Sequence, residues 1–251
     1  MGRPPEYERM LNSLRAFIRL IGRSSDGADV IELDGVVGSV CPSVPDRSLP
    51  NSVIYESQEA LIDALPELSR RYDEAGVQAW TVWTPADDSE AIAALDEAGH
   101  KLDADPTAMT IGLATLGEPP DIDYRTGDHL IPVIGSINDC AYPVEDDPFT
   151  RMMSRHPPGV TSNYVADVDG EPAACLQILP VDGDALVLLV ATVPDARGRG
   201  LASRLILRAL CDAREDGCDL STLQATKLGE PVYARMGYES LGPIQMWEKR
   251  P

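Results

Sequence analysis

Residues 185–210 constrain the fold of this 251-residue chain more than any other stretch. The apolar run 185–193 is rich in valine and leucine, which predicts a buried strand. From Leu201 onward apolar residues recur at helical spacing with arginines between them, which predicts a helix that is buried on one side. Gly198 and Gly200 lie between the two segments. The stretch therefore predicts a strand, a glycine turn and a helix in direct succession.

A glycine turn at the start of a helix can bind an anion. The first amides of the helix have no intrahelical partner and point outward with the positive end of the helix dipole. Glycine has no Cβ, so a ligand can approach the backbone closely. A diphosphate gains roughly 1.5–3 kcal/mol from each hydrogen bond of this charge-assisted kind. An ordinary solvated turn would have the same composition, so the turn by itself leaves both interpretations open.

Two motifs follow one another in the second half of the chain. The first is Arg-x-x-Gly-x-Ala at residues 197–202, directly after a strand end, and the second is Tyr-x-x-x-Gly-Tyr at residues 233–238. The first resembles the acyl-CoA pyrophosphate loop of the GNAT N-acetyltransferase superfamily. The second resembles the ending of the last helix in that family. This resemblance is strong over residues 121–251 and weak over the first half.

The first half also resembles the second. The Asp-Gly turns at Gly35 and Gly170 are 135 positions apart, and the glycines Gly99 and Gly237, which end two predicted helices, are 138 apart. A nearly constant offset between matching landmarks indicates an internal repeat. We therefore predict two tandem modules with the same fold.

The two predicted modules differ at the cofactor loop. The segment 39–75 of the first has no glycine, and Leu95 stands at the position that matches Tyr233. We predict that residues 1–118 form a degenerate GNAT-like domain without a cofactor loop, and that residues 121–251 form the GNAT N-acetyltransferase domain. This layout is similar to that of mycothiol synthase.

The resemblance implies an α/β (α+β) fold, in which each module is a mixed, mainly antiparallel sheet flanked by helices. Apolar periodicity and turn residues predict the individual elements. Helices are predicted over 7–21, 58–75, 88–98, 127–141 and from 201 onward, and strands over 30–33, 36–40, 78–84, 164–168, 173–179, 185–193, 221–224 and 244–248. Residues 142–159 are predicted to be rich in loops.

The resemblance further implies roles for residues of the second module. Amides in Val190, Ala191 and Thr192 would bind the pantetheine arm of acetyl-CoA. The diphosphate would bind at a loop that comprises Arg197, Gly198, Arg199, Gly200, Leu201 and Ala202. Tyr233 has the position of the family's general acid, from which a phenol can protonate the leaving thiolate; packing in the core is its alternative role. Thr226 stands where the family often has an asparagine in contact with pantetheine.

The sequence defines the acceptor side less well. Glu145, Asp146 and Asp147 follow the predicted helix 127–141, and similar proteins place the acceptor under this segment. These three carboxylates are candidates for acceptor binding, and together with Glu171 they are candidates for the general base, although a solvated surface carboxylate is the better explanation of each. A chain of water molecules is another source of the base, so its identity stays open.

Composition excludes several classes of function. A net charge of -20 argues against nucleic acid as a partner, because phosphate recognition needs a basic face. No segment is long and apolar enough to span a membrane, and the start has no apolar signal core, so we expect a cytoplasmic protein. Five cysteines and three histidines form no metal-ligand pattern, so no metal is expected. His156 precedes two prolines and is interpreted as a loop residue.

These observations favour an N-acetyltransferase that transfers an acetyl group from acetyl-CoA to a small amine by direct attack in a ternary complex. Two alternatives stay open: a non-catalytic acyl-CoA-binding or regulatory protein, and a protein N-terminal acetyltransferase. The first module is expected to be structural and to help wall the acceptor site. The acceptor, the acyl chain preference and the oligomeric state are not determined by the sequence.

Overall fold

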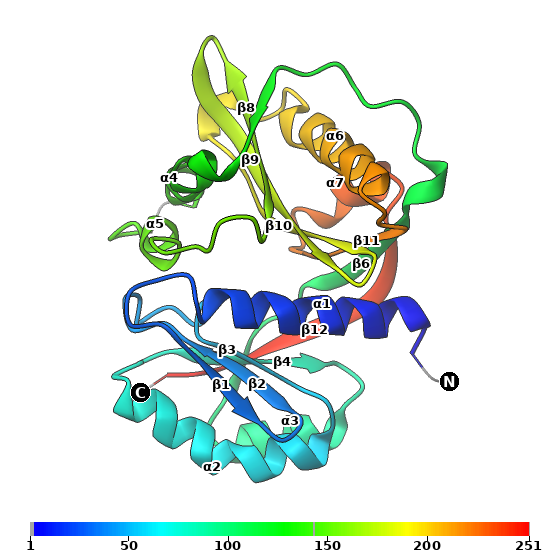
Figure 1. Cartoon of the computed structure of the whole chain (residues 1–251). Coiled ribbons are helices and arrows are strands. Elements are labelled where there is room, and N and C mark those ends of the chain that lie inside the picture. Colours follow the sequence, from blue (N-terminus) through cyan, green and yellow to red (C-terminus); the bar gives the residue numbers. More distant parts are fainter. Residues whose placement is uncertain (1–2, 143, 251) are drawn as a thin grey trace.

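A computed structural model describes residues 3–142 and 144–250, and its strands form one continuous sheet (Figure 1). The strand order is β1-β2-β3-β4-β12-β6-β11-β10-β9-β8-β7, with β5 paired to β12. The strands are β1 (Asp29–Leu33), β2 (Val36–Val40), β3 (Ser52–Tyr55), β4 (Trp80–Pro85), β5 (Lys101–Ala104), β6 (Thr107–Gly112), β7 (Tyr124–Thr126), β8 (Ser162–Val168), β9 (Glu171–Val181), β10 (Asp184–Thr192), β11 (Leu220–Ala225) and β12 (Glu239–Lys249).

Seven α-helices and three short 3-10 helices occur in the described residues. The α-helices are α1 (Pro5–Ile21), α2 (Gln58–Glu74), α3 (Ser89–Glu97), α4 (Ile131–Ala141), α5 (Pro148–Met152), α6 (Leu201–Glu215) and α7 (Glu230–Arg235). The 3-10 helices are η1 (Leu113–Thr115), η2 (Asp128–Leu130) and η3 (Pro194–Ala196). No helix within residues 3–142 or 144–250 has the length and apolarity that a membrane span requires.

The two halves repeat one topology. In the first half β1, β2 and β3 are antiparallel neighbours, and α2 leads from β3 to the parallel strand β4. In the second half β8, β9 and β10 are antiparallel neighbours, and α6 leads from β10 to the parallel strand β11. The predicted fold class, a mixed and mainly antiparallel sheet flanked by helices, is confirmed.

The helices that follow these parallel strands also end alike. Gly99 after α3 and Gly237 after α7 have φ of 89° and 99°, which glycine adopts at no steric cost. In both places the amide of the next residue donates to the carbonyl five residues earlier, at 2.9 Å after α3 and 3.1 Å after α7. This is the hydrogen bond of a glycine-terminated helix. The offset between the two glycines in the sequence therefore marks equivalent places in the fold.

The two halves exchange strands at the middle of the sheet. β6, which lies in the first half of the sequence, pairs with β11 of the second half. β12 runs beside β6 at its start and then beside β4 and β5 of the first half, with Ile244–Lys249 opposite β4. The division into residues 1–118 and 121–251 stays a prediction about domains, and each range contributes a strand to the sheet of the other.

Helix α1 lies between the two halves (Figure 1). Its apolar side chains share one hydrophobic core with residues of β2 and β3 and with residues of β9 and β10. Two polar contacts fix it to the second half: Ser13 Oγ donates to Asp184 Oδ2 at 2.6 Å, and Arg9 Nη2 donates to Asp219 Oδ1 at 2.6 Å. The first half thus covers one face of β9 and β10 through α1.

The structure confirms the predicted helices and strands as elements, with shifts at their ends, and adds elements that the patterns missed. β3, β5, β6 and β7 were not predicted, α5 forms inside the segment expected to be loop-rich, and β12 begins at Glu239 and not at residue 244. All four residues of β3 are buried, so the strand has no alternation of apolar and polar residues. β12 contains Gly242 and Pro243, which interrupt a strand pattern in the sequence.

Candidate functional site

The strands β10 and β11 separate at one end of the sheet. They pair only over Asp184–Leu186 and Leu220–Thr222. Beyond these residues β11 continues beside β6 as far as Ala225, whereas β10 continues beside β9 as far as Thr192. The separation leaves the two strand ends without ladder hydrogen bonds to one another, so backbone groups there can bind a ligand.

A β-bulge lies on β10 at this opening. The register against β9 shifts between Leu188 and Ala191, and Leu189 has a φ of 49°. A left-handed conformation at a leucine is strained by about 1–3 kcal/mol, so the surroundings must hold it. The Leu189 carbonyl accepts a hydrogen bond from Asn138 Nδ2 at 3.2 Å, and the Val190 carbonyl accepts one from the Tyr142 hydroxyl at 3.3 Å. Contacts from α4 and its end therefore fix the bulge.

The predicted glycine turn and helix start follow β10. Gly198 and Gly200 are exposed, have φ of 76° and 72°, and a Cβ added at either would meet no atom within 4 Å. α6 begins at Leu201, and no side chain caps its first amides. The backbone of this turn is therefore open to solvent, with helix amides available to an anion.

The arginines of the turn bind protein carbonyls. Arg197 Nε donates to the Thr192 carbonyl at 3.1 Å, and its Nη2 donates to the Ala141 carbonyl at 2.7 Å. Arg199 Nη2 donates to the Asp195 carbonyl at 3.3 Å. Arg197 therefore joins the end of α4 to the end of β10, and residues 198–200 are left as the exposed part of the turn.

Tyr233 lies on α7 and packs against the core that contains α6. Its ring centroid is 5.8 Å from that of Tyr238 in an edge-on arrangement. Burial raises the pKa of the Tyr233 phenol above its ordinary value, so the group is protonated at neutral pH. Among the residues described by the structure, the Tyr233 hydroxyl has no hydrogen-bond partner, whereas Tyr238 shares a 2.7 Å hydrogen bond with Ser221. The Tyr238 hydroxyl is thus engaged in a hydrogen bond, whereas the Tyr233 hydroxyl is available to a ligand.

The loop before α7 sets the position of the Tyr233 ring. A Cβ added at Gly229 would lie 3.1 Å from Tyr233 Cε2, so a side chain there would press on the ring. The Thr226 hydroxyl accepts a hydrogen bond from the Gly229 amide at 3.2 Å. Thr226 therefore stabilises this turn, and its hydroxyl hydrogen is the part that remains for another partner.

The acidic candidates lie on the surface. Glu145, Asp146 and Asp147 are exposed, and Asp146 and Asp147 have φ of 69° and 47°. Glu171 is exposed and begins β9 at the hairpin with β8. Within the described part of the chain, none of these carboxylates has a salt-bridge partner, and no group of three or more His, Cys, Asp or Glu suited to a metal ion occurs.

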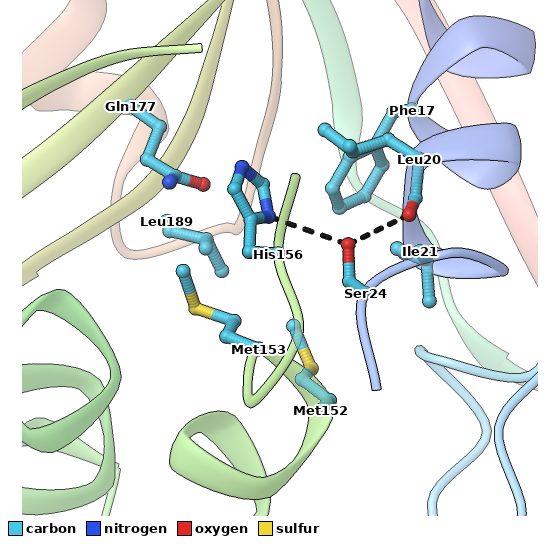
Figure 2. Close-up of a pocket in the computed structure, with 9 residues that line it drawn as sticks. All are labelled: Phe17, Leu20, Ile21, Ser24, Met152, Met153, His156, Gln177 and Leu189. Atoms are coloured by element: carbon cyan, nitrogen blue, oxygen red, sulfur yellow. Dashed lines mark hydrogen bonds between the residues drawn. The ribbon is translucent and has the colours of Figure 1, made fainter. Parts of the chain in front are cut away.

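The sequence analysis missed a cavity of about 10 Å³, with room for no more than one water molecule, beside the bulge and between α1 and the loop after α5 (Figure 2). The pocket is lined by Phe17, Leu20, Ile21 and Ser24 of the first half and by Met152, Met153, His156, Gln177 and Leu189 of the second. His156, interpreted above as a loop residue, contacts Ser24 across the two halves. The nearest signal in the sequence was the amphipathic pattern of α1, which does not identify its partner.

A comparison with protein families matches residues 161–240 to the family described as "Acetyltransferase (GNAT) domain". This range contains β10, the glycine turn, α6, β11 and α7. Residues 161–240 form a GNAT acetyltransferase domain. The family transfers acyl groups from acyl-CoA, so the GNAT domain supports acyltransferase activity and acyl-CoA as the donor.

Solved structures share the fold of the whole chain. A GCN5-related N-acetyltransferase from Kribbella flavida is 18% identical with a TM-score of 0.66, over 95% of this chain and 95% of that one. A functionally unknown conserved protein from Staphylococcus epidermidis is 16% identical with a TM-score of 0.65, and the match covers 89% of this chain and 94% of that protein. A tandem GNAT protein from the clavulanic acid biosynthesis pathway is 14% identical with a TM-score of 0.56, and the match covers 100% of this chain and 89% of that protein. The search of curated proteins gives no match. The tandem GNAT layout predicted from the internal repeat agrees with these folds.

Proposed function

We propose that the protein is an N-acetyltransferase that transfers the acetyl group of acetyl-CoA to a small amine by direct attack in a ternary complex. The observation that carries this proposal is the opening between β10 and β11 next to an exposed glycine turn at the start of α6. A long ligand with an anionic end can lie along β10 and reach helix amides with its phosphates. Acetyl-CoA has this chemistry.

The cosubstrate would be held mainly by backbone groups. Amides in Val190, Ala191 and Thr192 would bind the pantetheine arm beside the bulge. The diphosphate would bind the turn that comprises Arg197, Gly198, Arg199, Gly200, Leu201 and Ala202. Thr226 can donate its hydroxyl hydrogen to the same ligand while accepting from the Gly229 amide.

Tyr233 would be the general acid for the leaving thiolate. The group must be protonated before the reaction and free to donate, and both conditions fit a half-buried phenol without a hydrogen-bond partner in the described structure. Tyr238 is also protonated, but it fails the second condition because its hydroxyl is engaged with Ser221.

The acceptor would approach from the side of the sheet that α1 and α5 cover. The carboxylates of Glu145, Asp146 and Asp147 would attract a cationic amine to this side, since they are exposed on the loop before α5. The first half, taken as residues 1–118, would be a structural module without a cofactor site, and residues 121–251 would carry the chemistry. A cytoplasmic location suits the use of acetyl-CoA.

The test is a screen of an amine library with acetyl-CoA, in which the release of free thiol is followed. The proposal predicts thiol release that depends on particular amines, and an acetylated amine as the second product. Binding of acetyl-CoA without thiol release from any small amine would contradict the proposal and favour the non-catalytic alternative. Release that occurs only with peptide N-termini would favour the protein N-terminal acetyltransferase.

A further inference from the structure

The bulge of β10 contains a residue that neither neighbouring strand pairs. The register against β9 shifts between Leu188 and Ala191, and the pairing with β11 ends at Leu186. Val190 therefore has no ladder partner on either side among the described residues, and the extra residue of a bulge leaves its backbone groups to other partners. In the proposed function Val190 is one of the residues whose amides hold the cosubstrate. The direction of its amide thus matters for the chemistry.

The side chain that fixes this direction is Asn138 of α4. This helix packs its apolar residues on β8, β9 and β10, and Asn138 is 1% exposed. Asn138 Nδ2 donates to the Ile134 carbonyl of its own helix at 2.9 Å and to the Leu189 carbonyl of the bulge at 3.2 Å. Both partners are carbonyl oxygens, which only accept, so the nitrogen of the side-chain amide faces them. Its two hydrogens are thus both engaged.

A thiol completes the surroundings of the Leu189 carbonyl. Cys175 Sγ of β9 lies 3.4 Å from Asn138 Nδ2 and 3.6 Å from the Leu189 oxygen. Burial raises the pKa of the Cys175 thiol to about 12, so the sulfur is uncharged at neutral pH. An asparagine amide does not titrate. The carbonyl is therefore held by neutral groups, and its position does not depend on pH around neutrality.

A held carbonyl also fixes the amide of the same peptide unit. The unit is planar and trans, and no cis bond occurs among the described residues, so the carbonyl of one residue and the amide of the next point in opposite directions. Because Asn138 holds the Leu189 carbonyl toward α4, the Val190 amide points away from α4. Leu189 has a φ of 49°, a strained conformation for leucine. Without the Asn138 hydrogen bond this peptide can therefore rotate.

The peptide after Val190 is held from the next turn of the chain. The Tyr142 hydroxyl donates to the Val190 carbonyl at 3.3 Å, but Tyr142 is 47% exposed and water competes for this contact. On the other face of the sheet the Val190 side chain packs against the core that contains α6. The buried Asn138 contact is thus the one that sets the peptide to which the Val190 amide belongs.

We propose that Asn138 is a positioning residue for acyl transfer that acts through the Val190 amide, an inference that rests on the proposed function. By holding the Leu189 carbonyl, Asn138 directs the Val190 amide to the carbonyl oxygen of the thioester. When the amine nitrogen bonds to the thioester carbon, an electron pair of the carbonyl moves to this oxygen, and the amide stabilises the charge that develops there.

The remaining steps restore the neutral groups. The electron pair on oxygen re-forms the double bond, and the bond between carbon and sulfur breaks. The thiolate takes the phenolic proton of Tyr233, and the surplus proton of the nitrogen passes to water. The phenolate then regains a proton from water. Asn138 gains and loses no atom, so its effect on the reaction is one of orientation alone.

Two measurements test the proposal. The first uses wild-type protein labelled with ¹⁵N-valine and compares the Val190 amide in the complexes with acetyl-CoA and with CoA, which has no thioester carbonyl. The proposal requires a downfield shift of the Val190 amide proton in the acetyl-CoA complex that CoA does not produce. Equal shifts in the two complexes would overturn it. This result depends on no variant and on no acceptor amine, so it decides even where a variant does not fold.

The second measurement compares Asn138→Leu with Tyr72→Phe. Leucine keeps the branched shape of asparagine and removes the donor. Tyr72 is buried in the first half, and its hydroxyl donates to the Ser39 carbonyl at 3.0 Å, so Tyr72→Phe also removes a buried donor to a strand carbonyl. The readouts are kcat with an accepted amine, the Kd for acetyl-CoA, and the infrared band of a ¹³C-labelled thioester carbonyl in the bound acetyl-CoA.

For Asn138→Leu we expect kcat to fall by about 10²-fold and by the same factor at each pH around neutrality, with the Kd unchanged within about twofold. The carbonyl band should lie at a higher frequency than in the wild-type complex, because the hydrogen bond to its oxygen is weakened. Tyr72→Phe should keep the wild-type kcat and band.

A wild-type kcat and carbonyl band in Asn138→Leu would refute this role and leave the proposed function standing. An equal loss of kcat in Tyr72→Phe would also refute the role, because the loss would then follow from any buried hydrogen bond. A wild-type protein that binds no acetyl-CoA, or that acetylates no amine, would refute both.

Discussion

Replacement of Tyr233 by phenylalanine separates a catalytic hydroxyl from a structural one. The hydroxyl has no hydrogen-bond partner among the described residues, so its removal leaves no buried polar group unpaired. The ring still packs 5.8 Å from Tyr238, because phenylalanine has nearly the same shape. We expect kcat to fall by about 10²–10⁴-fold, with the Kd for acetyl-CoA and the free energy of unfolding nearly unchanged.

Tyr238→Phe is the matched control. This change removes a 2.7 Å hydrogen bond to Ser221, whose hydroxyl also contacts the Ala185 carbonyl at 2.7 Å. Because Ser221 keeps that second partner, the loss should lie near the lower end of the 1–3 kcal/mol range for a broken buried hydrogen bond, about 1 kcal/mol. For a chain of this size such a loss lowers the Tm by about 2–4 °C.

The assay combines thiol release with an accepted amine and thermal melting for both variants. For Tyr233→Phe we expect a large loss of turnover at constant Tm. For Tyr238→Phe we expect a lowered Tm with turnover largely kept. Unchanged turnover together with a lowered Tm for Tyr233→Phe would assign this tyrosine to the core and refute the reasoning.

Three further results are expected. Gly229→Ala should lower kcat without weakening acetyl-CoA binding, because its Cβ would lie 3.1 Å from Tyr233 Cε2. Gly112→Ala is the control for the same kinetic assay and should be neutral, because a Cβ there meets no atom within 4 Å. Burial, with a smaller effect of Lys249, lowers the pKa of His100 from 6.5 to about 4. Between these two pH values the unfolded chain binds a proton that the folded chain does not. The free energy of unfolding should therefore fall by up to about 3 kcal/mol as the pH drops from 6.5 to about 4. Denaturant titrations at several pH values should show this slope reduced in His100→Leu, and an unchanged slope would contradict it. A fragment of residues 121–251 lacks α1 and β6, the partner of β11, and should show no cooperative melting by circular dichroism; a stable and fully active fragment would disprove a structural role for the first half.

Local patterns predicted the parts of the fold in which neighbours in sequence are neighbours in space. The turn at Gly198 and Gly200, the helix from Leu201 and the paired glycines Gly99 and Gly237 are of this kind, because each needs only a few consecutive residues. β3 was missed because a strand that is buried on both faces has no alternation to detect.

Other features depend on contacts that no local pattern contains. β12 passes from the second half into the first, and its sequence does not state which strands will lie on either side. His156 and Ser24 are 132 residues apart and meet only because α1 packs on β9 and β10.

The most direct test of the account is a calorimetric titration of the full-length protein with acetyl-CoA. The account predicts one molecule bound per chain, because the exposed glycine turn at a helix start follows β10 and has no counterpart in segment 39–75. Gly200→Glu should abolish binding, because it places a carboxylate at the diphosphate. Gly76 has the same left-handed φ and the same open space but lies away from the turn, so Gly76→Glu should bind acetyl-CoA normally. Two equivalent sites per chain, or undiminished binding by Gly200→Glu, would contradict the account.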